Sequence, residues 1–403
     1  MRAPVSLVLV GIGGMGAVYI RELLEKKDGG LFRIAGAVDP EPNRCHQFTE
    51  MRAMGVPCFI SLSDFYRNRA AELAVLSSPI QCHKPQTCLA LAKGSHVLCE
   101  KPAAGTIQEV REMAEAEKAS ARWVAVGYQW SFSSAVQDLK KDVMSGLLGK
   151  AERFKCLYLW PRDEAYYRRN DWAGKKRDEE GVWVLDSPVQ NAMAHDLHNV
   201  FYLLGKGTDS SARPVSVEAE LYRANAIENF DTAAARVRTE EGVEILFLVS
   251  HASNGDKGPV IRFEFEKAVV RCDSRESGLW AEFQDGTRKD YGVPDAEPMN
   301  KLWQSIAGVR EDTRPLCGLE AAASQTLCMN GMQESMPEIR DFPAGLVRAI
   351  DTAGGARRRA VEGLDEALES CYEAGRLPSE MGVPWSAKGT AVDLGDYAAF
   401  PTR

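Results

Sequence analysis

The feature that most constrains the fold is a glycine-rich turn near the N-terminus. It consists of Gly11, Ile12, Gly13, Gly14, Met15 and Gly16, and it directly follows the apolar run at residues 5–10. A helical pattern then covers residues 17–26. Gly11 allows a sharp turn, Gly13 a close backbone approach to a pyrophosphate, and Gly16 close packing of the helix on the strand. Because the free N–H groups of the helix start attract phosphate, the segment predicts a dinucleotide-binding turn.

The second predicted strand, at residues 32–38, ends at Asp39. A carboxylate at this place accepts hydrogen bonds from ribose hydroxyls and repels a 2′-phosphate. No arginine stands at positions 40 or 41 to hold such a phosphate, although Arg44 is near. NAD is therefore the expected cofactor, and NADP is the less favoured alternative.

Strand and helix patterns alternate through residues 1–127, which predicts an α/β Rossmann domain with a parallel sheet. Ligands of such sheets bind beyond the carboxyl ends of the strands. We therefore expect the loops at 11–16, 39–40, 77–79, 100–102 and 127–130 to line one crevice. Besides the glycine turn and Asp39, the cofactor residues expected there are Ser77, Ser78, Pro79, Glu100, Lys101 and Gln129, with His83 supporting the cofactor loop.

The pattern changes after Gly127, and residues 128–403 are expected to form an α+β domain. Its strand signals predict a large, mostly antiparallel open sheet of about six strands. They lie at 151–160, 216–223, 232–237, 243–251, 260–266 and 279–283. A helical hairpin is expected within 299–335. Residues 377–403 are rich in Gly, Pro and Ala and predict an extended tail.

Composition narrows the class of protein. The net charge is −8 with no basic block, which disfavours nucleic acid and anionic membrane surfaces as partners. No apolar run reaches the length of about 18 residues that a membrane helix needs, so we expect a cytoplasmic protein. The ten cysteines include no C-x-x-C pair, and they are expected to be reduced and mostly buried. No metal site is expected, because no set of Cys and His has ligand spacing.

A second motif lies in residues 186–205, which are expected to form one amphipathic helix ending at Gly205. Asn191, His195 and His198 fall at i, i+4 and i+7, so they would share one face. Such a polar stripe must either point into a wet cleft or find partners in the core.

Together these features resemble the Gfo/Idh/MocA oxidoreductase family. The resemblance rests on the glycine turn, Asp39-Pro40, Ser78-Pro79 with His83, Glu100-Lys101-Pro102, and the helix carrying His195. It implies that Lys101 contacts a substrate hydroxyl near the nicotinamide and that His195 lies opposite as an acid/base or ligand. It also implies that Gln129 and Trp130 face nicotinamide and substrate. The family usually has an aspartate four residues before the histidine, whereas this chain has Asn191, and it has His198 where another aspartate is common. The choice of Lys101 or His195 as base stays open.

The run at residues 160–174 combines aromatic and arginine residues in a predicted loop. Aromatic faces bind the C–H faces of sugars, and arginine binds hydroxyls or acids. Tyr167, Arg168 and Trp172 are therefore candidate substrate residues. An oligomer contact or a loop clamp is the alternative, because interfaces are enriched in the same residue types.

The expected activity is NAD-dependent oxidation of a secondary hydroxyl of a sugar, polyol or cyclitol. Oxidation of an alcohol needs a hydride acceptor and a base, and Lys101 or His195 can supply the base. One alternative is a glycosidase that uses tightly bound NAD through transient oxidation, elimination, hydration and reduction. Another is a non-catalytic NAD-binding regulator of the same fold. The resemblance also implies that the domain at residues 128–403 binds the substrate and mediates oligomerisation, as a homodimer or homotetramer.

Overall fold

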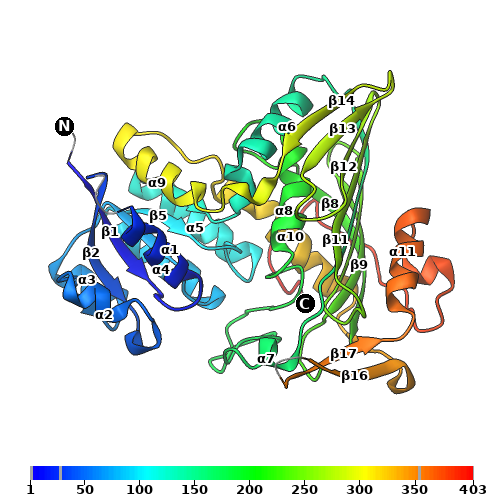
Figure 1. The fold of residues 1–403 in the computed structure, drawn as a ribbon, viewed down its shortest axis with the longest axis horizontal. Coiled ribbons are helices and arrows are strands. Elements are labelled where there is room, and N and C mark those ends of the chain that lie inside the picture. The colour runs from blue at the N-terminus through cyan, green and yellow to red at the C-terminus, as the bar shows by residue number, and fades with distance from the viewer. Residues whose placement is uncertain (1–2, 27–29, 353–354, 403) are drawn as a thin grey trace. The chain divides into compact units, whose positions relative to one another are not determined.

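The structure, a computed structural model, describes residues 3–26, 30–352 and 355–402 (Figure 1). The chain divides into two compact units, and each is described by itself. The first comprises residues 1–132 and 297–323, and the second comprises residues 133–296 and 324–403. The predicted division at residue 127 is close to the first crossing of the chain, but it did not anticipate the return of residues 297–323 to the first unit.

The first unit contains a six-stranded parallel sheet in the order β3-β2-β1-β4-β5-β6. Its strands are short and almost entirely apolar, as expected for strands covered on both faces. From β1 the chain builds outward through β2 and β3 on one side, and then continues through β4, β5 and β6 on the other side. The strand order therefore reverses between β1 and β4, and the crevice of this fold lies beyond the carboxyl ends of these two strands. The strands are β1 (Val5–Val10), β2 (Phe32–Val38), β3 (Cys58–Phe59), β4 (Leu73–Leu76), β5 (His96–Cys99) and β6 (Val124–Val126).

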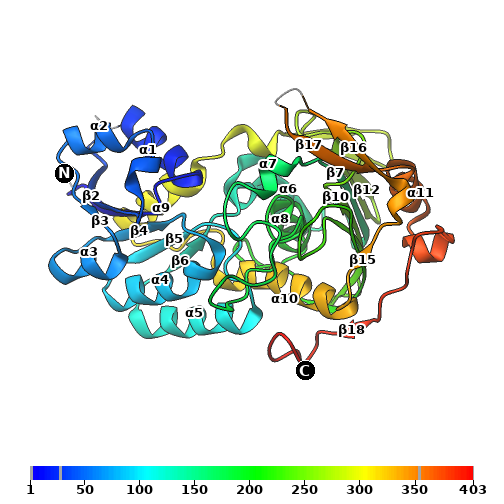
Figure 2. The same cartoon turned by 90° about the horizontal axis from the view of Figure 1, so that it is seen from below.

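Helices cover both faces of this sheet (Figure 2), with α4 and α5 on one face and α1 and α9 on the other. α5 begins where the sequence indicates, because Thr106 and Glu109 form a capping box. α9 is held against α1 by the Trp303 indole N–H, which donates to Glu22 Oε1 at 2.7 Å. This packing explains why a late segment belongs to the first unit. The helices are α1 (Met15–Glu25), α2 (Phe48–Ala53), α3 (Leu62–Asn68), α4 (Ile80–Ala92), α5 (Ile107–Ser120) and α9 (Asn300–Glu311).

The second unit contains a ten-stranded, mostly antiparallel sheet in the order β14-β13-β12-β11-β7-β10-β9-β8-β15, with β18 also paired to β8. Two pairs, β7 with β10 and β8 with β15, are parallel. All six expected strands are present, but the estimate of about six was too low. The strands are β7 (Ala151–Leu159), β8 (Pro214–Arg223), β9 (Thr232–Thr239), β10 (Glu244–Ser250), β11 (Lys257–Phe265), β12 (Ala268–Cys272), β13 (Leu279–Phe283), β14 (Arg288–Gly292), β15 (Arg340–Asp341) and β18 (Val392–Asp393).

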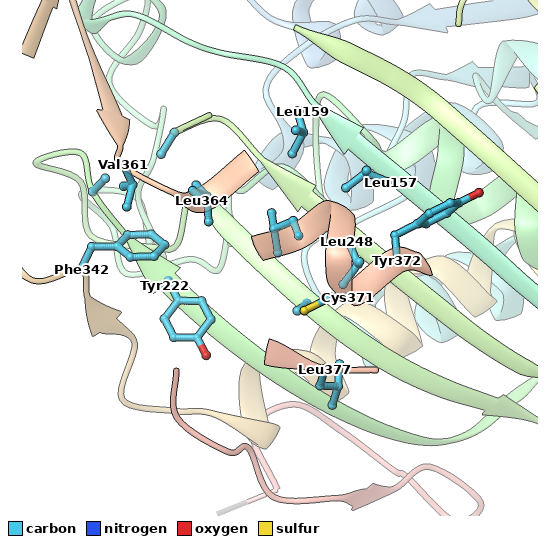
Figure 3. Close-up of a cluster of buried hydrophobic side chains, with 14 of the residues drawn as sticks. Leu157, Leu159, Tyr222, Leu248, Phe342, Val361, Leu364, Cys371, Tyr372 and Leu377 are labelled. Atoms are coloured by element: carbon cyan, nitrogen blue, oxygen red, sulfur yellow. The ribbon is translucent and has the colours of Figure 1, made fainter. Parts of the chain in front are cut away.

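Helices α8 (Ala194–Leu203) and α10 (Leu319–Ser335) lie on one side of this sheet, and α11 (Leu364–Ala374) lies on the other (Figure 1). Figure 3 shows α11 side chains, Leu364 among them, packed with Leu157 and Leu248 of the strands. The sheet is open in strand order, as predicted, and α11 covers part of one of its faces. α6 (Ser134–Met144) and the short α7 (Glu164–Tyr167) complete this group of helices, and β16 (Val347–Asp351) pairs with β17 (Arg357–Val361) as a separate hairpin.

The late helices, the C-terminal tail and the cysteines lie as follows in the structure. The segment 299–335, expected as a helical hairpin, contains the two helices α9 and α10, and the boundary between the two units falls within α10. The tail is largely extended up to Thr402, while Arg403 lies outside the described residues. All ten cysteines are free, and most are buried, which confirms the prediction. Within the described residues, no helix is long and apolar enough to cross a membrane.

Candidate functional site

The glycine turn follows β1 and leads into α1. Gly11 has φ +75°, a conformation that other residues rarely adopt, and a Cβ here would lie 2.8 Å from the Ser77 backbone. Both the backbone conformation and the lack of space therefore require glycine. At Gly16 a Cβ would lie 1.8 Å from the Gly11 carbonyl oxygen. These contacts bring the turn, the start of α1 and the loop after β4 into direct contact.

Asp39 ends β2 and is tied to the same turn. Its Oδ2 accepts the Ile12 N–H at 2.9 Å, and its Oδ1 accepts the Glu41 N–H at 2.8 Å. Two carboxylate oxygens offer about four acceptor positions, so further positions remain for ribose hydroxyls.

The turn fits a dinucleotide because there is open space over the N-terminus of α1. A Cβ on Gly13 or Gly14 would meet no atom within 4 Å, and the N-cap residue Gly14 supplies no side chain to cap the first turn. Gly14 and Met15 are exposed, so their N–H groups can receive a phosphate, whereas the Gly16 N–H donates to the Gly13 carbonyl oxygen. The residues that would hold NAD are the glycine turn, Asp39 and the loop after β4.

Glu100 and Lys301 form a buried ion pair beneath Lys101. Lys301 Nζ donates to Glu100 Oε1, which also accepts the Tyr19 hydroxyl at 2.7 Å, and both charged side chains are almost fully buried. Burial is the largest single influence on Glu100 and opposes its ionisation. The charge and hydrogen bond of Lys301, with the Tyr19 hydrogen bond and the Lys101 charge, together outweigh it and hold the pKa of this carboxyl below its usual range. Glu100 Oε2 accepts the Lys101 backbone N–H at 3.1 Å. Glu100, expected as a cofactor residue, therefore fixes the backbone that carries Lys101.

His83 connects the loop after β4 with the loop after β5. Its ring nitrogens lie 2.8 Å from the Pro102 carbonyl oxygen and 2.9 Å from the Ser78 carbonyl oxygen, and the ring is buried. Burial lowers the pKa of His83, although both carbonyl oxygens favour the charged ring. The side chain thus acts as a strut that positions the Ser78 and Lys101-Pro102 backbones, as the sequence suggested.

The other expected residues of the first unit also lie beyond strand ends. Ser77 and Ser78 follow β4, and Pro79 caps α4. Gln129 and Trp130 form a short 3₁₀ helix after β6, in which Trp130 is buried and Gln129 is partly exposed. The predicted set is therefore gathered at the carboxyl edge of one parallel sheet.

In the second unit, the helix expected over residues 186–205 is shorter than predicted. α8 begins at Ala194, and residues 186–193 form turns. Asp186 holds these turns, because its carboxylate accepts the Asn191 side-chain N–H at 3.0 Å and the Gly174 N–H at 2.6 Å. Asn191 and His195 therefore do not lie on one regular helix face, although both remain partly exposed.

His198 does not fit the expected role in substrate binding. The side chain is fully buried and stacks on Tyr202 with ring centroids 5.5 Å apart. Burial, with the nearby charge of Lys140, lowers the pKa of His198 to about 3. This residue is a neutral core histidine, because α8 turns it inward while His195 stays partly exposed.

The run at residues 160–174 forms a loop around α7, and its three candidate side chains have different surroundings. Arg168 is exposed and pairs with Glu164 at 2.8 Å. Tyr167 and Arg168 line a groove of about 420 Å³ together with residues 225–228. Trp172 lies instead beneath Arg169, whose guanidinium carbon is 5.2 Å from the ring centroid.

Sequence reasoning missed two sets of residues. Lys301 lies two hundred residues from its partner Glu100, and no motif marks it. Arg162 and Arg169 lie within the highlighted loop, but only the structure shows that they stack on its aromatic rings. No cluster of three or more His, Cys, Asp and Glu side chains that could hold a metal occurs in the part of the chain that the structure describes.

Comparisons with known proteins agree with this architecture. Residues 5–128 match the family described as "Oxidoreductase family, NAD-binding Rossmann fold", and residues 136–271 match the "GFO/IDH/MocA C-terminal domain". An inositol 2-dehydrogenase from Corynebacterium glutamicum is 28% identical over 78% of this chain and 88% of its own length. The rhizopine catabolism protein MocA from Rhizobium meliloti is 28% identical, but the match spans only 40% of this chain and 47% of that protein. The structure of the WlbA dehydrogenase from Bordetella pertussis, in complex with NADH and UDP-GlcNAcA, superposes with a TM-score of 0.67 at 22% identity, covering 83% of this chain and 97% of that one.

Proposed function

Because this chain belongs to the Gfo/Idh/MocA family of NAD(P)-dependent oxidoreductases, we propose that it oxidises one secondary hydroxyl of a sugar, polyol or cyclitol to a ketone. The name of the Corynebacterium relative, an inositol 2-dehydrogenase, supports this substrate class. The observation that carries the proposal is the anchoring of Lys101. Its backbone is fixed by Glu100 and the His83 strut at the strand edge that also carries the glycine turn.

The chemistry divides between cofactor and protein. When bound, NAD supplies the hydride acceptor. The residues of this chain then handle the proton of the substrate hydroxyl, and we assign this task to Lys101 and His195, one as base and the other as a hydrogen-bond partner of the oxygen. Asn191 can bind a neighbouring hydroxyl, and its amide carries no charge that would favour an imidazolium.

NAD rather than NADP is the proposed cofactor. Asp39 places a negative charge at the end of β2, next to the glycine turn that it contacts through Ile12. A 2′-phosphate at this position would meet a carboxylate, whereas two ribose hydroxyls would donate to it. The exposed Arg44 is paired with Glu41, so its charge is already partly compensated.

The test is to compare Lys101→Met and His195→Asn with a matched control, Lys118→Met, which removes an exposed lysine paired with Glu115. We expect kcat to fall about 100-fold or more in the first two variants, since acid–base groups contribute about that much. The Kd for NAD should stay unchanged in both variants, and the control should behave like the wild type. Wild-type kcat in Lys101→Met would refute the assignment, and nucleotide binding without any turnover would favour a regulator.

A further inference from the structure

Arginine and aromatic side chains alternate in a ladder within the second unit. Arg275 and Arg162 both lie over the Trp160 ring, each with the guanidinium carbon 3.6 Å from the centroid. Arg162 continues to Tyr166 at 4.7 Å, and Arg169 lies 3.8 Å from the same Tyr166 ring. We call these five side chains the arginine–aromatic ladder. Stacking orients three guanidinium groups through their faces, and Arg169 also donates an N–H to the Tyr166 carbonyl oxygen.

The positive charge of the ladder is poorly balanced. Arg169 has a carboxylate nearby, with Asp186 at 3.8 Å. In the described part of the chain, Arg162 and Arg275 have no carboxylate oxygen within the 4.0 Å of an ion pair, and the buried Arg162 Nε has no hydrogen-bond partner. Burial lowers the pKa of Arg162, and the charges of Arg275 and Arg169 lower it further. A buried donor without an acceptor is costly, so this arrangement favours an anion from outside the chain.

His251 supplies a second, independent indication of a ligand. Its side chain is 1% exposed, its Nδ1–H donates to the Trp160 carbonyl oxygen at 2.8 Å, and its ring packs against Tyr166. The carbonyl partner fixes the proton on Nδ1, which leaves Nε2 as an acceptor, and this atom is buried without a partner. A hydroxyl group beside an anion would satisfy Nε2 and the arginine donors together.

The ladder lies on the face of the sheet that carries α8. Along β7, Leu157 and Leu159 pack with α11. The residue between them, Tyr158, points to the other face, where burial and then the charge of Asp196 in α8 raise its pKa. Trp160 follows by two residues and stacks on Tyr158 with an interplanar angle of 3°. Asp186 then links Arg169 to Asn191, four residues before His195.

We propose that the arginine–aromatic ladder binds an anionic oxygen group of the substrate, a carboxylate or a phosphate, through Arg162 and Arg275. Both groups match the planar fork of arginine, which can donate two parallel hydrogen bonds to either. The inference rests on the proposed function, because it places the anion on the molecule that is oxidised. The substrate class is then narrowed to acidic sugars or sugar phosphates, with a hydroxyl near the anion donating to His251.

The first arm of the test measures anion binding without turnover. Tryptophan fluorescence is followed during titration with sodium phosphate and with sodium acetate, against sodium chloride at matched ionic strength. We expect a saturable change with at least one anion, which is lost in Arg162→Gln and in Trp160→Phe. The control is Arg271→Gln. It also removes one positive charge, but Arg271 is paired with Glu282 of β13 at 2.6 Å and is not part of the ladder. No saturable response, or an unchanged response in Arg162→Gln, overturns the inference.

The second arm compares turnover of glucose, glucuronate and glucose 6-phosphate with NAD. We expect one of the acidic substrates to be preferred, and its KM to rise about 10- to 100-fold in Arg162→Gln, the loss of one or two charge-assisted hydrogen bonds. Arg162→Lys should recover part of the affinity, because it restores charge without the fork. An unchanged KM for the preferred acidic substrate in Arg162→Gln, or a wild-type preference for glucose over both acidic sugars, would overturn the inference and leave the proposed function standing. An anion response that depends on Arg162, without NADH formation from any sugar, would support the anion site and count against the proposed function.

Discussion

Replacing Lys301 by methionine tests the buried pair on which Lys101 depends. Lys301 is fully buried, and the substitution leaves the carboxylate of Glu100 without its cation. Removing one partner of a buried pair costs about 3–5 kcal/mol. Two donors to the carboxylate remain, the Tyr19 hydroxyl and the Lys101 N–H, so we expect a loss near the lower end, about 3 kcal/mol.

The pH dependence makes this prediction specific. In the wild type the pKa of Glu100 is lowered on folding. Its contribution to the free energy of unfolding is therefore fully present above the pKa of the unfolded chain and is lost as pH falls through the pKa of the folded protein. Without Lys301, burial should raise the folded pKa instead. The variant should then gain stability relative to wild type as pH falls through that raised pKa.

The assay is urea unfolding of the full chain from roughly pH 8 to 5, with hydrogen exchange of peptides from β5 and β6 locating the loss. The double variant Glu100→Gln, Lys301→Met should be more stable than Lys301→Met alone, because it removes the unpaired charge. If Lys301→Met lowered the free energy of unfolding by less than about 1 kcal/mol, independently of pH, the buried pair would have no special role. A loss of that size is expected of an exposed ion pair.

Three further results are expected. Asp39→Asn should raise the ratio of kcat/KM for NADP over NAD at least about tenfold, since it removes the like charge; an unchanged ratio contradicts the role of Asp39. Leu368→Ala, in the core between α11 and the sheet, should cost about 2–5 kcal/mol without changing KM, whereas the exposed Leu147→Ala should cost less than about 0.5 kcal/mol. Burial lowers the pKa of His251 to about 3, so the ring is neutral near pH 7. Any inflection of the pH–rate profile near neutrality should therefore remain in His251→Asn. Loss of that inflection in the variant would contradict the neutral ring.

The fold of the first unit could be predicted well from the sequence because its signals are local. The apolar strands, the glycine turn and the Thr106 capping box each depend on residues close together in the chain. The return of α9 could not be predicted in this way, since it depends on contacts such as that between Trp303 and Glu22. The same reason hid Lys301, whose partner lies far away in the sequence.

In the second unit, strands with alternating apolar residues were found and weaker ones were missed. β14 is mostly exposed and polar, and β15 and β18 are only two residues long, so hydrophobic periodicity does not mark them. α11 was also unforeseen, although it covers part of the sheet face that we expected to be open for oligomerisation. A homo-oligomer remains a proposal, and its interface would have to use surface that α11 leaves exposed.

The candidate site was predicted best where a motif fixes the backbone. The glycine turn and Glu100-Lys101-Pro102 lie at strand ends as expected, whereas helical spacing failed for Asn191 and His198. Asp186 holds Asn191 in a turn before α8, and the helix buries His198. The arginines of the 160–174 loop could be recognised as a group, but which of them are stacked depends on the folded path of the loop.

The most direct test of the central claim is the stoichiometry of NADH formation by the purified protein with a panel of sugars, cyclitols, sugar acids and glycosides. We expect one NADH to be released for each hydroxyl oxidised, measured by the near-ultraviolet absorbance of NADH together with analysis of the ketone product. Release of sugar from a glycoside with no net NADH, and with nicotinamide retained by the protein, would contradict it and establish an internal redox cycle instead.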